Sequence, residues 1–145
     1  MPVRAGDLNL RMAVARRQSG VLWEHQRAAI ETAARYMEAP DVDGNSCLIT
    51  MPTGTGKTGV IASIVNALPS VVGHRLVLTP WNALVVQLIE DLSGRFWENL
   101  PEQDRPALLP VRRLPPSSEL ESLLAEATPT IFVATIAAMA VVNAT

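Results

Sequence analysis

Hydrophobic positions alternate along the chain between short continuous runs and longer stretches with helical spacing. The short runs predict buried strands, and recurrence every three or four residues predicts amphipathic helices. Predicted strands cover residues 47–51, 75–80 and 130–135, and predicted helices cover residues 8–18, 23–38, 57–68 and 117–127, with another helix beginning near residue 82. Strands that alternate with helices favour a parallel sheet with helices on its faces. The expected fold class is therefore α/β.

Residues 46–58, Ser-Cys-Leu-Ile-Thr-Met-Pro-Thr-Gly-Thr-Gly-Lys-Thr, join the first predicted strand to the helix after it. Gly54 and Gly56 allow the backbone to curl with its N–H groups facing inward, and the helix dipole adds positive potential for an anion. This pattern predicts a phosphate-binding loop. Lys57 and Thr58 are the expected catalytic residues, with Lys57 on the β- and γ-phosphates and the Thr58 hydroxyl on Mg²⁺. The predicted nucleotide-binding residues of the loop are Pro52, Thr53, Gly54, Thr55, Gly56, Lys57 and Thr58.

The loop resembles motif I of superfamily 2 helicases and translocases, which include DEAD/DEAH-box and restriction-type helicases. A general Walker loop, Gly-x-x-x-x-Gly-Lys-Thr, would place a glycine at Met51, whereas this helicase motif commonly has another small or apolar residue there. The resemblance implies a partial RecA-like (P-loop NTPase) domain over residues 41–145, after a helical segment over residues 1–40. It also implies ATP and Mg²⁺ as cofactors.

The helix predicted over residues 23–38 opens with the sequence Trp-Glu-His-Gln, which ends at Gln26. Many superfamily 2 helicases carry an aromatic-x-x-Gln sequence ahead of motif I. The resemblance implies that the Gln26 amide, with donors and acceptors, binds the adenine edge of ATP. A surface glutamine without this role is the alternative. Trp23 is expected to be a core anchor rather than a stacking platform.

The ends of the second and third predicted strands resemble helicase segments that contact nucleic acid. Thr79, Pro80 and Trp81 resemble motif Ia, and Thr135 lies in a segment similar to the one ahead of the Asp-Glu box in restriction-type helicases. The resemblance implies that these four residues contact DNA or RNA, with the Thr79 and Thr135 hydroxyls and the N–H donors of the helix start on its backbone. Trp81 packs either on the chain itself or on a nucleotide, and both alternatives stay open. Arg112 and Arg113 could also reach phosphate, but a solvated charge pair is favoured there.

Hydrolysis of ATP by this class requires an Asp-Glu pair at a strand end, and no predicted strand of the chain ends in one. The expectation is the N-terminal part of a longer ATP-dependent helicase or translocase, whose remaining domains, or other subunits, are its partners. The restriction-type motifs suggest a restriction or phage-defence system. Two alternatives stay open: another P-loop NTPase, and a non-catalytic nucleotide-binding or scaffold module.

Composition refines this interpretation. The 145 residues carry a formal net charge of −2, so any contact with nucleic acid needs a local face. Eleven of the 12 cationic residues are arginines, and the one lysine is Lys57. The single cysteine, Cys47, permits no internal disulfide and is expected to be buried in the first predicted strand. The N-terminus lacks the apolar core of a signal peptide, and the most apolar run, residues 131–142, is shorter than the roughly 20 residues that span a bilayer, so a cytoplasmic protein without membrane contact is expected.

Overall fold

A computed structural model of the chain describes residues 22–38, 46–68 and 72–142. In chain order the elements are α2 (Glu24–Glu38), α3 (Lys57–Ala67), β1 (Arg75–Thr79), α4 (Asn82–Glu90), the π-helix η3 (Asp91–Arg95), the 3₁₀ turns η4 (Trp97–Asn99) and η5 (Glu102–Asp104), β2 (Val111–Arg113), α5 (Ser117–Leu124), β3 (Ile131–Thr135) and α6 (Ile136–Val142). The helix predicted over residues 8–18 lies outside the described residues.

The three strands form an all-parallel sheet in the order β1-β3-β2. Arg75 pairs with Ile131 at one end of β1, and Thr79 pairs with Thr135 at the other. Strand β3 is central and is buried from Ile131 to Ala134, as its continuous apolar sequence requires. These features confirm the predicted α/β class and are consistent with an incomplete RecA-like fold.

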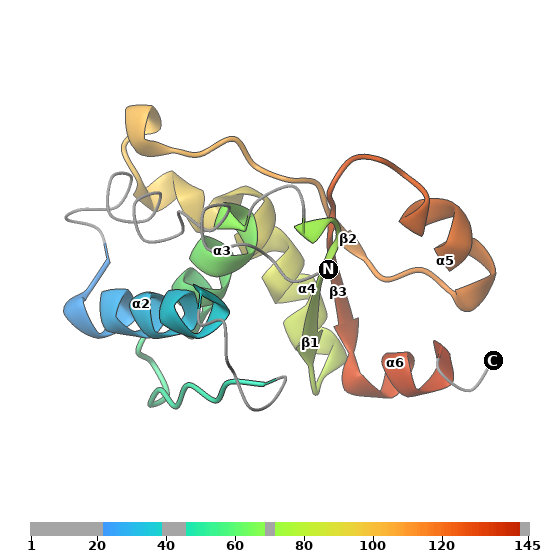
Figure 1. Cartoon of the computed structure of the whole chain (residues 1–145), viewed down its shortest axis with the longest axis horizontal. Helices are drawn as coiled ribbons and strands as arrows, with labels where there is room; N and C mark the ends of the chain where they lie inside the picture. Colours follow the sequence, from blue (N-terminus) through green and yellow to red (C-terminus); the bar gives the residue numbers. More distant parts are fainter. Residues whose placement is uncertain (1–21, 39–45, 69–71, 143–145) are drawn as a thin grey trace.

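Helices cover the sheet in layers. Helix α4 lies against all three strands, and α3 packs against α2 on the side away from the sheet. Figure 1 shows α2 at one end of the molecule and α5 and α6 at the other, with α3, α4 and the sheet between them. The buried side chains of α2 are Gln26, Ala29, Ile30, Ala33 and Ala34. This spacing places them on one face, which explains why the predicted helix forms.

Helix α3 contributes to two hydrophobic clusters. Ala62 belongs to the cluster that includes Val85 of α4 and Val133 of β3. Val60 belongs to the second cluster, with Ile30 of α2. Phe96, which follows η3, is the one partly buried hydrophobic side chain of the described residues that packs against both clusters. The helix behind the glycine loop is therefore packed on two sides.

The predicted strand over residues 47–51 is wrong for this structure. Residues 46–51 carry no strand, and the side chain of Leu48 is 91% exposed. An apolar run becomes a buried strand only where neighbouring strands pair with it, and none of the described strands borders this segment. Cys47 is consequently exposed, against the prediction of a buried thiol.

The prediction that Trp23 anchors the core is also wrong, because this side chain is 59% exposed. Trp23 lies one residue before α2, outside its buried face, and its neighbour Leu22 fills the core position at 4% exposure. Strand β2 was not predicted at all. It is only three residues long, and its place in the sheet depends on pairing with β3. None of the described helices is long and apolar enough to cross a membrane.

Candidate nucleotide site

The glycine loop has the backbone geometry that an anion site needs. Gly54 and Gly56 have φ values of 79° and 74°, in the left-handed region that favours glycine. Gly56 is the N-cap residue of α3, and no side chain caps this helix start. The first N–H groups of a helix have no partner within the helix, and the first turn of α3 contains no acidic residue. The start of α3 is therefore a donor-rich, electropositive site open to a phosphate.

Two polar side chains of the loop, those of Thr55 and Lys57, converge on one acceptor. The Lys57 ammonium donates a hydrogen bond to the carbonyl oxygen of Pro52 at 3.0 Å, and the Thr55 hydroxyl donates to the same oxygen at 2.6 Å. Lys57 is exposed. The Lys57 ammonium thus lies across the loop, bonded to Pro52, where a nucleotide phosphate could bind it instead.

Thr58 lies in the first turn of α3 and is partly buried. The described residues contain no group of three or more His, Cys, Asp or Glu side chains that could hold a metal ion. Phosphate fits the donors of the loop. Mg²⁺ fits only as an ion held jointly by the Thr58 hydroxyl and phosphate oxygens, since no cage of protein carboxylates is present among these residues.

Gln26 is brought directly to the loop from α2. Its side chain is 7% exposed, and its amide nitrogen donates a hydrogen bond to the carbonyl oxygen of Gly56 at 3.0 Å. Its amide oxygen accepts a bond from the backbone N–H of Trp23 at 2.9 Å. A primary amide has two N–H groups and two oxygen lone pairs. These two bonds therefore leave one N–H group and one lone pair for a ligand. Gln26 is a buried link between α2 and the loop, and not a surface glutamine.

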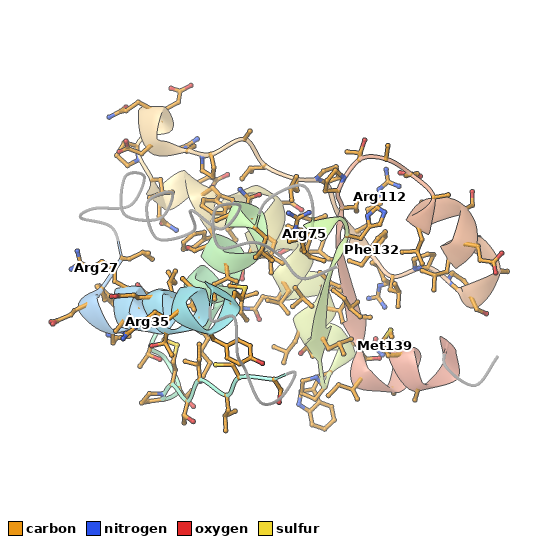
Figure 2. All side chains as sticks on the ribbon, in the orientation of Figure 1. Arg27, Arg35, Arg75, Arg112, Phe132 and Met139 are labelled. Carbon is orange, nitrogen blue, oxygen red and sulfur yellow. The ribbon has the colours of Figure 1, made fainter. Side chains whose placement is uncertain are left out.

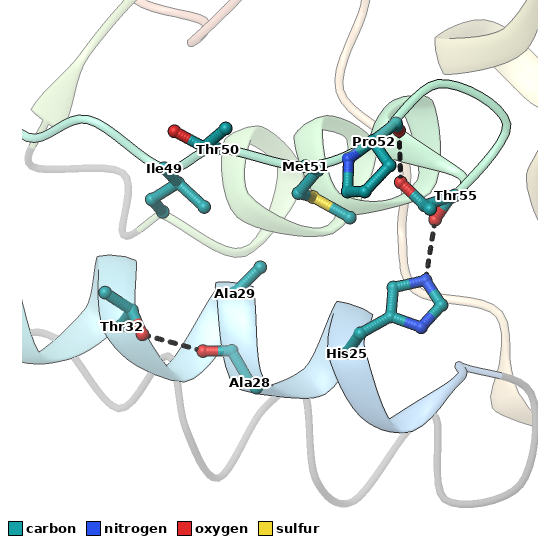
Figure 3. Close-up of a pocket in the computed structure, with 9 residues that line it drawn as sticks. All are labelled: His25, Ala28, Ala29, Thr32, Ile49, Thr50, Met51, Pro52 and Thr55. Carbon is teal, nitrogen blue, oxygen red and sulfur yellow. Dashed lines mark hydrogen bonds between the residues drawn. The ribbon is translucent and has the colours of Figure 1, made fainter.

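His25 is a second link between α2 and the loop. Its Nε2 atom lies 2.9 Å from the carbonyl oxygen of Thr55 (Figure 3). A cavity of about 500 Å³ opens beside this contact, between one face of α2 and the segment that leads into the loop (Figure 3). Its lining is His25, Ala28, Ala29, Thr32, Ile49, Thr50, Met51, Pro52 and Thr55. The cavity adjoins the loop through Pro52 and Thr55, whereas Gln26 does not line it.

The residues predicted to contact nucleic acid gather at the carboxyl edge of the sheet. Thr79 and Thr135 are paired residues at the ends of β1 and β3. Thr79 is 4% exposed, and the Thr135 hydroxyl accepts a hydrogen bond from the N–H of Ala138 at 3.1 Å. Pro80 is exposed, and Trp81 is 68% exposed at the N-cap of α4. Trp81 is thus the most accessible large side chain of this edge.

Two neighbouring arginines of β2 have different partners. Arg112 forms an ion pair with Glu126 at 3.8 Å, a partner that the sequence pattern did not predict. Arg113 donates a hydrogen bond to the side-chain oxygen of Asn82 at 3.4 Å, at the start of α4 beside Trp81. The structure therefore separates the roles of this basic pair and adds Arg113 to the candidate nucleic-acid edge.

Arg75 is a cation with a structural role at the opposite end of β1. It lies inside the molecule (Figure 2), where its guanidinium donates hydrogen bonds to the carbonyl oxygens of Gly73 and Leu68. Leu68 is the C-cap residue of α3, so Arg75 supports the negative end of the helix that begins at the loop. Burial lowers the pKa of Arg75 below its ordinary value.

Sequence reasoning did not single out three residues that lie at or beside the loop in the structure: His25, Gly59 and Phe96. His25 stands inside the quoted aromatic-x-x-Gln segment, and Gly59 follows the motif I threonine directly, so both had a positional signal. Phe96 had none, because it reaches the loop helix through a contact between residues far apart in sequence.

The comparisons with known proteins bear on the whole described region. Residues 20–141 match the family described as type III restriction enzyme, res subunit. Comparisons with curated proteins and with solved structures gave no match. The family match spans the loop, Gln26 and the carboxyl edge of the sheet, and it supports the resemblance to the N-terminal part of a superfamily 2 helicase. The chain therefore belongs to the family of type III restriction enzyme res subunits, in which its domain is a helicase-like ATP-binding module.

Proposed function

We propose that the chain is the ATP-binding part of an ATP-dependent helicase or translocase that acts on DNA or RNA in a restriction or phage-defence system. The observation that carries this proposal is the uncapped start of α3 behind two left-handed glycines, with Lys57 held at the loop mouth. Backbone N–H groups of Gly56, Lys57 and Thr58 would receive the phosphates. Bound Mg²⁺ would neutralise phosphate charge, held in part by Thr58.

The remaining site residues are proposed to contact either the adenine base of ATP or the nucleic acid. In this proposal Gln26 offers its second N–H and a lone pair to the adenine edge, while its first N–H stays on Gly56. Thr79, Pro80, Trp81 and Thr135 form the nucleic-acid edge at the carboxyl ends of β1 and β3. The partners are DNA or RNA, together with the second RecA-like domain or another subunit, and the protein acts in the cytoplasm.

Hydrolysis requires a carboxylate pair that these residues do not provide. Strands β1, β2 and β3 end at Thr79, Arg113 and Thr135, so no strand of the described residues ends in Asp-Glu. We therefore propose that the full-length gene product supplies this pair and that the chain alone binds ATP without turning it over. The same observation favours, as a second candidate, a non-catalytic nucleotide-binding module. Another P-loop NTPase is the less favoured option because the family match is to a helicase-like domain.

The deciding experiment measures ATP hydrolysis by the full-length gene product with and without single-stranded and duplex DNA or RNA, beside the 145-residue chain. We expect stimulation by nucleic acid in the long form, no turnover by the chain, and no turnover by the long form carrying Lys57→Ala. Because Lys57 is exposed, the variant should melt at the same temperature as the parent. ATP hydrolysis that no nucleic acid stimulates would favour another P-loop function. Unchanged turnover in Lys57→Ala would refute the assignment of the loop as a phosphate site.

A further inference from the structure

Gly59 lies in the first turn of α3, three residues after the N-cap Gly56, and is fully packed. A Cβ atom at this position would lie 2.7 Å from Cε2 and 3.2 Å from Cζ of Phe96, and 3.4 Å from the amide nitrogen of Gln26. Distances below 3.0 Å force a neighbour to move. The turn that follows the loop is thus enclosed by two side chains from other elements.

Gly56 meets the same amide from the other direction. A Cβ atom at Gly56 would collide with the amide nitrogen of Gln26, which donates its hydrogen bond to the Gly56 carbonyl. Gln26 is therefore bonded to Gly56, and its amide nitrogen lies within van der Waals reach of a Cβ atom placed at Gly59. The backbone N–H groups proposed to bind phosphate lie between these two contact points.

Phe96 is held firmly on its own side. Its N–H donates to the Asp91 carbonyl at 3.0 Å, a bond that closes the π-helix η3. Its ring packs edge-on against Trp97, with ring centroids 4.9 Å apart at an angle of 74°. Trp97 is 3% exposed and donates its indole N–H to the Leu92 carbonyl at 3.2 Å. A movement of the ring away from Gly59 would alter its packing against this buried tryptophan.

We propose that Phe96 and Gln26 are positioning residues that clamp the Gly59 turn and thereby hold the loop N–H groups in place for phosphate. The inference rests on the proposed nucleotide function of the loop. Phe96 touches no ligand in this proposal, and it acts only through α3.

The test places a methyl group in the clamp. In Gly59→Ala the new Cβ collides with Phe96 and shifts the first turn of α3, although alanine ordinarily stabilises a helix relative to glycine. We expect the affinities for ATP·Mg and GTP·Mg to fall by the same factor, on the order of 10-fold. Equal loss follows because the phosphates are displaced and the base contacts are not. Isothermal titration on the 145-residue chain measures both affinities, well below the melting temperature of each variant.

Rescue and control variants separate positioning from general damage. Phe96→Leu in the Gly59→Ala background makes room for the methyl group, and we expect most of the lost affinity to return. Gly94→Ala is the matched control, because a Cβ atom at Gly94 meets nothing within 4 Å, and its affinity should equal that of the parent. Unchanged affinity in folded Gly59→Ala, or no recovery in the double variant, would overturn the proposal.

A second variant covers the case in which Gly59→Ala does not fold. Phe96→Ala removes the ring without crowding the turn, and we expect both nucleotides to bind about 3- to 10-fold more weakly. Parental affinity in folded Phe96→Ala would also overturn the clamp. The proposed function fails separately, if the parent chain binds neither nucleotide or if Lys57→Ala binds both as tightly as the parent.

Discussion

The side-chain amide of Gln26 donates a hydrogen bond to the carbonyl oxygen of Gly56, 3.0 Å away. This bond joins α2 to the loop across 30 residues of sequence. The glutamine was expected to read adenine, yet the structure shows half of its hydrogen-bonding capacity already committed to the protein. Any selectivity for adenine must come from the other half.

Gln26→Ala should weaken ATP binding in two ways. It removes the bond to Gly56, whose carbonyl oxygen keeps the N–H groups of Gly59 and Val60 as donors, at a net cost of about 0.5–1.5 kcal/mol, and it removes the adenine contact. We expect lower affinity for both ATP and GTP and a smaller preference for ATP, measured by competition between the two nucleotides. Gln103→Ala, an exposed glutamine in η5, is the control. An unaltered ATP-to-GTP preference would count against the adenine role.

Arg113→Ala should weaken the binding of the full-length gene product to DNA or RNA. Arg113 lies beside Asn82 at the start of α4, where it can reach a phosphate at the carboxyl edge of the sheet. Loss of one phosphate contact reduces the slope of affinity against salt concentration by about one, uniformly across sequences. Arg112→Ala is the matched control, since Arg112 is paired with Glu126. Equal salt slopes in the two variants would remove Arg113 from the interface.

Arg75→Met should destabilise the fold and leave the loop intact. The buried guanidinium donates hydrogen bonds to the carbonyl oxygens of Leu68 and Gly73, and charged hydrogen bonds of this kind contribute roughly 1.5–3 kcal/mol each. We expect the free energy of unfolding in urea to fall by about 2–4 kcal/mol. Arg35→Met removes only an exposed pair with Glu31 and should change stability by less than about 0.5 kcal/mol. A similar small effect for Arg75→Met would mean that its bonds add little to stability.

The local sequence pattern was sufficient to predict α2, α3, β1 and β3, because the spacing of apolar residues within each segment indicates its secondary structure. It also located the loop, because glycine conformation and helix N-termini act within a few residues. Residues 47–51 were mispredicted because an apolar run does not reveal whether strands will flank it. The proximity of Phe96 to Gly59 could not be predicted from the sequence, because the two residues belong to different elements that lie far apart in the chain.

The misprediction at residues 47–51 gives a direct test of the structure. Cys47 is exposed, so a maleimide should label the folded chain at a rate within about threefold of the rate in urea. Because Cys47 is the single cysteine, mass spectrometry of the intact chain reports this site alone. Strong protection in the folded chain would instead place the segment inside the sheet, as the sequence had suggested.

Helix α3 lies between both hydrophobic clusters, with Ala62 in one and Val60 in the other. Because both clusters use this helix as a wall, loss of α3 would expose side chains of each. We expect the two clusters to melt in one cooperative transition. A nucleotide at the start of α3 would stabilise this transition as a unit, by about 2.7 kcal/mol at a concentration 100 times its dissociation constant. A nucleotide bound at the loop would thus raise the melting temperature of both clusters together.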